Sequence, residues 1–353
     1  MQEYKRNYSL DFIKIIATIF IIFHHYQQIT GAYFHNKINF CNGKFYFGYM
    51  VELFFILSGF FMYSYINKIE QGTSFFEFYI KRITRLFPML LIGAISYEFL
   101  LIIYQYIYKS SWFDITPTFW GIIISSLGIQ DGWALPNPCV NNPTWYISVL
   151  MLCYIIFYFL VYISKRTKIR PQYLFIFMIF LGMGIQTYGI NLPFLNNSSS
   201  RGYYAFFFGL LLAEFLDKHN ITKRDILISI LSLTIMTYLI VYHYNFMSSG
   251  INYIMTYIYY PMVIILCKSN IIGRLLNRKI IGQLGRISFD VFIWHNPFYL
   301  LLYICIKLFN WNLNLNSWIT MVGYAVFCYI WGTISYYLIE QPIGKIINKR
   351  IKF

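Results

Sequence analysis

Two adjacent histidines, His24 and His25, lie in an apolar run over residues 15–28 that is otherwise suited to lipid. Ionisable side chains at membrane depth are costly and usually functional. His25 follows Lys14 by about three helical turns, which is about 16 Å along the axis with an angular offset of only about 20°. We therefore predict that His25 shares a helical face with Lys14, whereas His24 is rotated by about 100° from His25. The alternative for each histidine is a hydrogen bond that serves packing.

Three carboxylates bear on these candidates. Asp11 precedes Lys14 by one helical turn and is predicted to pair with it. Glu52, in the segment YMVELFFILSGFF, begins a second apolar helix at the predicted outer face, at a depth similar to His25. A carboxylate there would orient the ring and raise its basicity, so Glu52 is a catalytic candidate, and Glu98 near the outer end of the third span is the rival.

Arg82 and Arg85 stand one turn apart in YIKRITRLFP at a predicted membrane boundary. Two guanidinium groups on one helical face repel each other unless an anion lies between them, and the arginine fork suits phosphate oxygens. The pair is therefore a candidate phosphate site. The alternative is simple anchoring at the cytoplasmic face.

His295 and Trp145 complete the candidates. His295, in FDVFIWHNPFYL, is followed by Pro297, which should free a backbone carbonyl in the helix. It can contribute to the site or serve structure alone. Trp145 begins a span at the outer face, where an aromatic belt residue is the alternative. Together with His24 and Glu98, these two are candidate substrate contacts.

The composition indicates the elements that must position these residues. Of the 353 residues, 58% are hydrophobic and 12% are charged, far from soluble averages. Apolar stretches of about 17 to 25 residues recur, each long enough to cross a bilayer as a helix. The first lacks a cleavage site and is predicted to be a retained span. We predict an all-α transmembrane helix bundle forming one domain over residues 1–353.

The charge pattern predicts about ten spans and their orientation. Basic clusters around residues 81–85 and 165–170 should both be cytoplasmic, which leaves residues 118–129 as a short re-entrant or outer-surface segment. Both termini are then cytoplasmic. The net charge of +15 thus reports orientation, and a nucleic-acid partner is discounted. The predicted spans are 10–29, 48–66, 82–108, 143–163, 171–190, 202–216, 226–242, 253–267, 289–309 and 317–339.

The six cysteines show no metal-binding spacing, and no metal is expected. Cys41 and Cys139 fall in loops on the predicted outer face, so a disulfide between them is possible. The other four lie in apolar spans, where a small buried side chain is the expected role.

Six short segments along the chain carry a resemblance when taken together: LDFIK, ELFFILSGF, the Arg82 and Arg85 pair running into LFP, WYIS, WHNP and IEQP. In these segments the chain resembles the acyltransferase-3 family of polytopic membrane acyltransferases, which modify bacterial cell-envelope polysaccharides. The resemblance covers nearly the whole sequence. This chain departs from the family pattern in having Lys14 where arginine is more frequent, in the second imidazole of His24, and in lacking a glutamate after WYIS. It also ends soon after IEQP, so no fused extracytoplasmic domain is expected.

The resemblance implies a cytoplasmic acyl-CoA donor, most simply acetyl-CoA, an essential His25, and a donor-side role for Lys14, Arg82 and Arg85. The expected activity is O-acetylation of a carbohydrate hydroxyl by a multi-pass protein in contact with membrane lipid in the bacterial inner membrane. His25 would act as a general base or as a transient acyl carrier. The alternative function is a transporter or flippase of envelope glycans.

Overall fold

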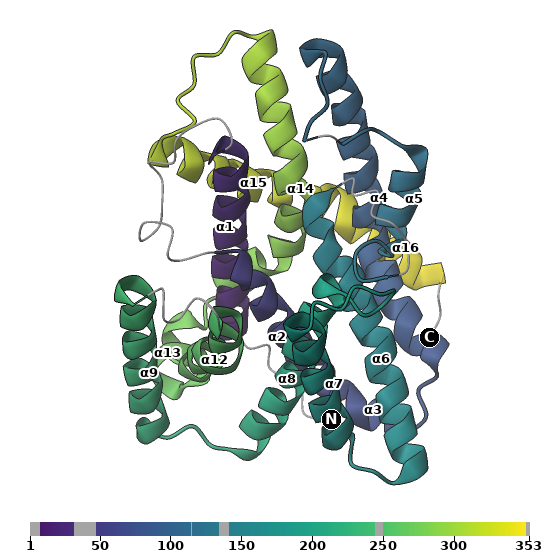
Figure 1. Cartoon of the computed structure of the whole chain (residues 1–353), viewed down its shortest axis with the longest axis vertical. Helices are drawn as coiled ribbons and strands as arrows, with labels where there is room; N and C mark the ends of the chain where they lie inside the picture. Colours follow the sequence, from purple (N-terminus) through teal and green to yellow (C-terminus); the bar gives the residue numbers. More distant parts are fainter. Residues whose placement is uncertain (1–7, 32–46, 114, 134–140, 244–249, 351–353) are drawn as a thin grey trace.

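The computed structural model describes residues 8–31, 47–113, 115–133, 141–243 and 250–350. All regular secondary structure in these ranges is helical (Figure 1). The principal helices are α1 (Tyr8–Gly31), α2 (Met50–Met62), α3 (Ile66–Glu70), α4 (Phe75–Tyr108), α5 (Phe119–Leu127), α6 (Trp145–Thr167), α7 (Pro171–Thr187), α8 (Asn197–Lys218), α9 (Lys223–Tyr242), α11 (Ile251–Ile254), α12 (Tyr260–Lys268), α13 (Asn270–Leu276), α14 (Lys279–Leu308), α15 (Trp318–Ser335) and α16 (Gln341–Arg350). The shorter turns are η2 (Phe47–Tyr49), η3 (Tyr63–Tyr65), η4 (Asn142–Thr144), η6 (Met255–Tyr259) and η7 (Tyr336–Glu340).

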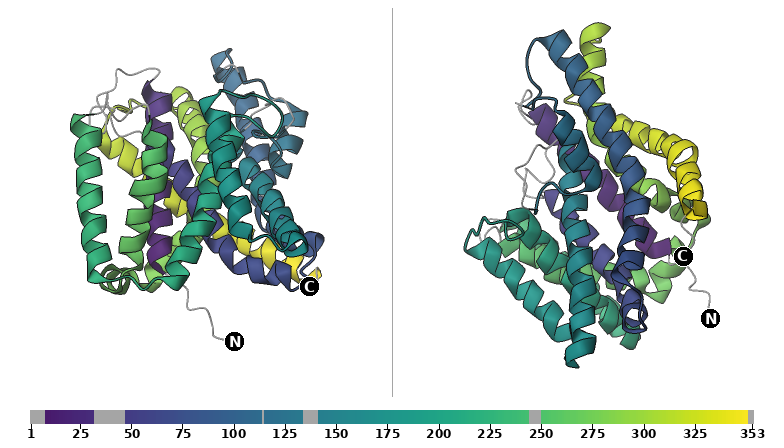
Figure 2. Two further views of the ribbon diagram at one scale, coloured as in Figure 1. Left: turned by 60° about the horizontal axis from the view of Figure 1, so that its bottom comes forward. Right: turned by 90° about the vertical axis from the view of Figure 1, so that its right-hand side faces the viewer.

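Within these ranges, 8 helical segments are long and apolar enough to cross a membrane. The all-α prediction is confirmed, and the chain is a multi-pass membrane protein. Each of the predicted spans falls on a helix, including the shorter α7 and the more polar α8. The number of crossings and the side of each terminus stay predictions. The start of α1 and the end of α16 lie at the same end of the bundle (Figure 2).

The segment 118–129 forms α5, a helix of 9 residues. At 1.5 Å per residue it is about 13 Å long, too short to cross a hydrocarbon core of about 30 Å. It packs against α4. Glu98 of α4 accepts hydrogen bonds from the backbone N–H of Thr118 at 3.1 and 3.2 Å, at the N-cap of α5. The carboxylate thereby satisfies a donor at the helix start.

The helices α2 and α8 approach so closely that only glycine fits between them. A Cβ atom at Gly59 would lie 1.9 Å from the carbonyl oxygen of Phe206, and one at Gly209 would lie 2.1 Å from that of Ile56. Small residues allow this backbone contact, which is how helices associate in lipid. The contact fixes α2 against α8 and so places Glu52 opposite Arg201.

Helix α14 continues through Pro297. Proline cannot donate to the carbonyl one turn earlier, so the oxygen of Ile293 loses its helical partner. The side chain of Asn141 supplies the replacement, because its Nδ2 donates to Ile293 O at 3.0 Å. Asn141 Oδ1 in turn accepts from Asn296 Nδ2 at 3.2 Å. The predicted free carbonyl is confirmed, and its satisfaction ties α14 to the start of α6.

The predicted roles of the cysteines are tested only in part. Cys153, Cys267 and Cys328 are buried and free, and Cys305 is partly buried and free. Cys41 and Cys139 lie outside the described residues, and so does their possible disulfide.

Candidate active site

A cavity of about 1770 Å³ opens between α1, α2, α4, α6 and α14. It is larger than the roughly 300–1,000 Å³ of ordinary ligand pockets. Lys14, Arg82 and Arg85 all line it, so the structure brings the three predicted donor-side residues into one space. Basic side chains outnumber acidic ones in the lining, which suits a large polyanionic ligand. The basic lining residues are Lys14, Lys68, Lys81, Arg82, Arg85, Arg170, Lys218, Lys268 and Arg286, and the acidic ones are Asp11, Glu70, Glu214 and Asp217.

Lys14 pairs with Asp11, as its spacing predicts: Nζ lies 3.3 Å from Asp11 Oδ1. The ammonium also lies over the ring of Phe61, 4.4 Å from its centroid. The Asp11 carboxylate is buried whereas Lys14 remains partly exposed. Lys14 therefore presents its charge to the cavity from a fixed position.

The two arginines have different surroundings. The Arg82 side chain is buried, donates from Nη1 to Phe78 O, and stacks on the rings of Tyr65 and Phe78 at 4.1 and 3.8 Å. Arg85 is exposed to the cavity. A stacked, hydrogen-bonded guanidinium is held in place, whereas an exposed one can move to a ligand. Of the two, Arg85 is thus the more available to a ligand in the cavity, whereas Arg82 is also part of the packing of α4.

His25 and His295 meet across the α1–α14 interface, with ring centroids 5.2 Å apart. His25 is half-buried, and its Nδ1 donates to Oε1 of the exposed Gln28 at 3.0 Å. His295 is fully buried, and its Nδ1 donates to Phe292 O at 2.7 Å. Because a carbonyl only accepts, this bond leaves Nε2 of His295 as the bare acceptor, and that atom has no hydrogen-bond partner among the described residues. Unpaired buried nitrogens are rare in folded proteins, and each calls for an explanation.

His24 is buried beside this pair, its ring centroid 5.1 Å from that of His25. The backbone around His295 is fixed by the Tyr324 hydroxyl, which donates to the His295 carbonyl. Three imidazoles are therefore contiguous at one level of the bundle.

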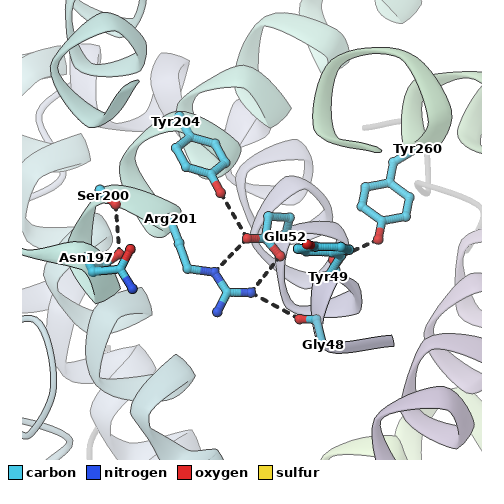
Figure 3. Close-up of polar contacts among 8 residues, drawn as sticks. All are labelled: Gly48, Tyr49, Glu52, Asn197, Ser200, Arg201, Tyr204 and Tyr260. Carbon is cyan, nitrogen blue, oxygen red and sulfur yellow. Dashed lines mark hydrogen bonds and ion pairs between the residues drawn. The ribbon is translucent and has the colours of Figure 1, made fainter. Parts of the chain in front are cut away.

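The structure gives Glu52 partners other than the predicted His25. Its fully buried carboxylate accepts from Arg201 Nε at 2.6 Å and Nη2 at 2.8 Å, and from the Tyr204 hydroxyl at 2.9 Å (Figure 3). Arg201 also donates to Gly48 O at 3.0 Å. The prediction that Glu52 orients His25 is therefore corrected: Arg201, near the start of α8, binds both carboxylate oxygens of Glu52.

Glu98 and Trp145 also have partners other than His25. Glu98 is buried and binds the N-cap of α5, as described above, so it does not serve as the rival partner of His25. The ring of Trp145, at the start of α6, lies 4.9 Å from the Arg201 guanidinium carbon. This cation–π contact places Trp145 in the Glu52–Arg201 cluster, next to the predicted outer face.

The fold is a multi-pass helical membrane protein in which a large cationic cavity lies below a pair of histidines. A sequence profile described as an acyltransferase domain, that of the acyltransferase-3 family, matches residues 7–337. The chain belongs to the acyltransferase-3 family, and it is a membrane acyltransferase. No curated protein and no solved structure matches the chain.

Sequence reasoning missed Arg201 and Asn141 and did not foresee that His295 faces His25. Arg201 follows three serines in a polar segment. A single arginine in such a segment is expected to be exposed to solvent. The predicted span 289–309 places His295 near its cytoplasmic end, whereas His25 lies in the outer half of the predicted span 10–29, so the predicted depths gave no reason to pair the two. The helix α14 begins earlier, at Lys279, and His295 therefore lies near its middle.

Proposed function

We propose that this protein transfers an acyl group, most simply acetyl, from cytoplasmic acyl-CoA to a hydroxyl of a cell-surface or envelope polysaccharide. The observation that carries the proposal is the basic cavity of about 1770 Å³, whose lining on α14 ends at Phe292, one helical turn before His295. Its charge suits the phosphates of CoA, and its volume suits a ligand of that size. The bacterial inner membrane is the proposed location.

In this proposal Arg85, with Lys14 and Arg82, holds the donor phosphates while the thioester arm extends between α2, α6 and α14. The half-buried His25 takes the proton of the acceptor hydroxyl as the oxygen attacks the acyl carbon. The C–S bond breaks, the ester C–O bond forms, and the proton passes to the CoA thiolate. The ring of His295 lies next to that of His25, and its unprotonated Nε2 is a second proton acceptor in the site.

The test is to incubate membranes containing the protein with acetyl-CoA labelled in the acetyl group and to identify what becomes labelled. Labelled glycan that depends on the protein is the expected result. A glycan that crosses membranes washed free of thioester, with no label transferred, would instead favour a transporter. Label trapped on the protein itself in the absence of acceptor would favour an acyl-histidine carrier over the general base.

Arg85→Ala is expected to weaken acetyl-CoA binding at least tenfold while changing kcat little. A charge-assisted bond to phosphate is worth about 1.5–3 kcal/mol, and each 1.4 kcal/mol is about a factor of ten. Titration of the purified protein with acetyl-CoA measures the dissociation constant directly. Arg166→Ala is the matched control, because Arg166 is an exposed arginine at the end of α6 that bonds to Tyr162. Equal affinities in the two variants would contradict the role of Arg85.

A further inference from the structure

The cavity stops short of the histidines. On α14 the lining runs from Gly285 to Phe292, and His295 follows one turn later. On α1 the lining ends at Lys14, and the next polar residue toward His25 is the buried Thr18. No residue of α1 between Lys14 and His25 lines the cavity. The thioester arm of a donor bound in the cavity must therefore pass the residues that close the end of the cavity nearest the histidines.

Three aromatic rings lie at the end of the cavity nearest the histidines. They are Phe54 of α2, Tyr146 of α6 and Phe292 of α14. Their centroids are 5.8 Å apart for Phe54 and Tyr146, 5.8 Å for Tyr146 and Phe292, and 6.2 Å for Phe54 and Phe292. All three line the cavity. On the other side, the Phe292 ring lies 5.6 Å from that of His295. The layer therefore separates the cationic cavity from the histidine pair.

The layer is held on two sides by polar contacts. The Tyr146 hydroxyl hydrogen-bonds with Ser58 Oγ at 2.9 Å and lies 3.3 Å from Phe54 O. The carbonyl of Phe292 accepts from His295 Nδ1. Tyr146 and Phe292 are buried, at 7% and 5% exposed, and Phe54 is partly exposed.

We propose that Phe54, Tyr146 and Phe292 form an acyl-selecting barrier, which admits a short acyl group from the donor cavity to the histidines and excludes long chains. The inference rests on the proposed function. Passage requires the rings to part by the width of the acyl group, and each extra methylene adds volume to a packed layer. Inserting excess volume into such packing is unfavourable, and we expect acetyl to be preferred over a medium-length chain by tenfold or more.

The experiment compares acetyl-, butanoyl- and octanoyl-CoA as labelled donors to membranes that contain each variant. The wild type is expected to prefer acetyl-CoA. Phe292→Ala removes one ring and should raise the octanoyl-to-acetyl ratio of kcat/KM at least tenfold, with Phe292→Leu giving a smaller rise in the same direction. Phe54→Ala tests the layer from a second helix and should also raise the ratio.

Phe298→Ala is the matched control. It deletes the same side chain from the same helix, but Phe298 packs on Trp294, Phe327 and Trp331, beyond the histidine level. Its ratio should stay at the wild-type value, and acetyl-CoA binding by each variant shows that it is folded. Variants that bind and transfer acetyl but keep the wild-type ratio would overturn the barrier. Transfer from none of the three donors, even by the wild type, would instead overturn the proposed function.

Discussion

His25→Ala is expected to lower acetyl transfer by about 10²–10⁴-fold, the range that a positioned general base contributes. Donor affinity should not change, because His25 is not among the residues that line the cationic cavity. The two quantities are separable: titration with acetyl-CoA measures binding, and label incorporated into the acceptor measures transfer. A loss confined to transfer would locate His25 at the chemistry.

Two comparisons sharpen this result. His243→Ala removes an exposed imidazole at the end of α9 and should leave transfer unchanged. His295→Ala deletes the ring 5.2 Å from His25 and should lower transfer without altering donor affinity. A His25→Ala protein that still transfers the label at the wild-type rate would refute the assignment of His25 as the base.

Arg201→Met is expected to lower the free energy of unfolding by about 3–5 kcal/mol, the usual cost of removing one partner of a buried ion pair. The substitution leaves the fully buried Glu52 carboxylate without its bidentate partner, and the Tyr204 hydroxyl cannot balance a full charge. Unfolding in mixed detergent micelles measures the change.

The double variant Glu52→Leu, Arg201→Met should recover most of that loss, because apolar side chains of similar volume often replace a buried ion pair without penalty. This variant also decides the role of Glu52. If the pair is structural, the double variant is stable and still transfers acyl groups. Recovered stability with lost transfer would restore Glu52 to the catalytic site.

Short-range spacing explains what was predictable about the site. Asp11 and Lys14 are one turn apart on one helix, and the structure pairs them. Arg82 and Arg85 likewise share a helix and line one cavity. These outcomes follow from helical geometry alone. The sequence could not foresee that stacking on Tyr65 and Phe78 fixes Arg82 while Arg85 stays exposed, because that depends on a neighbouring segment.

The sequence by itself determined the class of the protein: long apolar runs must be helices in lipid, where every backbone group needs an internal partner. It also determined which side chains share a face of their own helix. Only the tertiary structure decided which faces meet: His25 with His295, and Glu52 with Arg201. The physical reason is that helix pairing in lipid depends on close backbone fit, as at Gly59 and Gly209, and such fits join residues far apart in the chain.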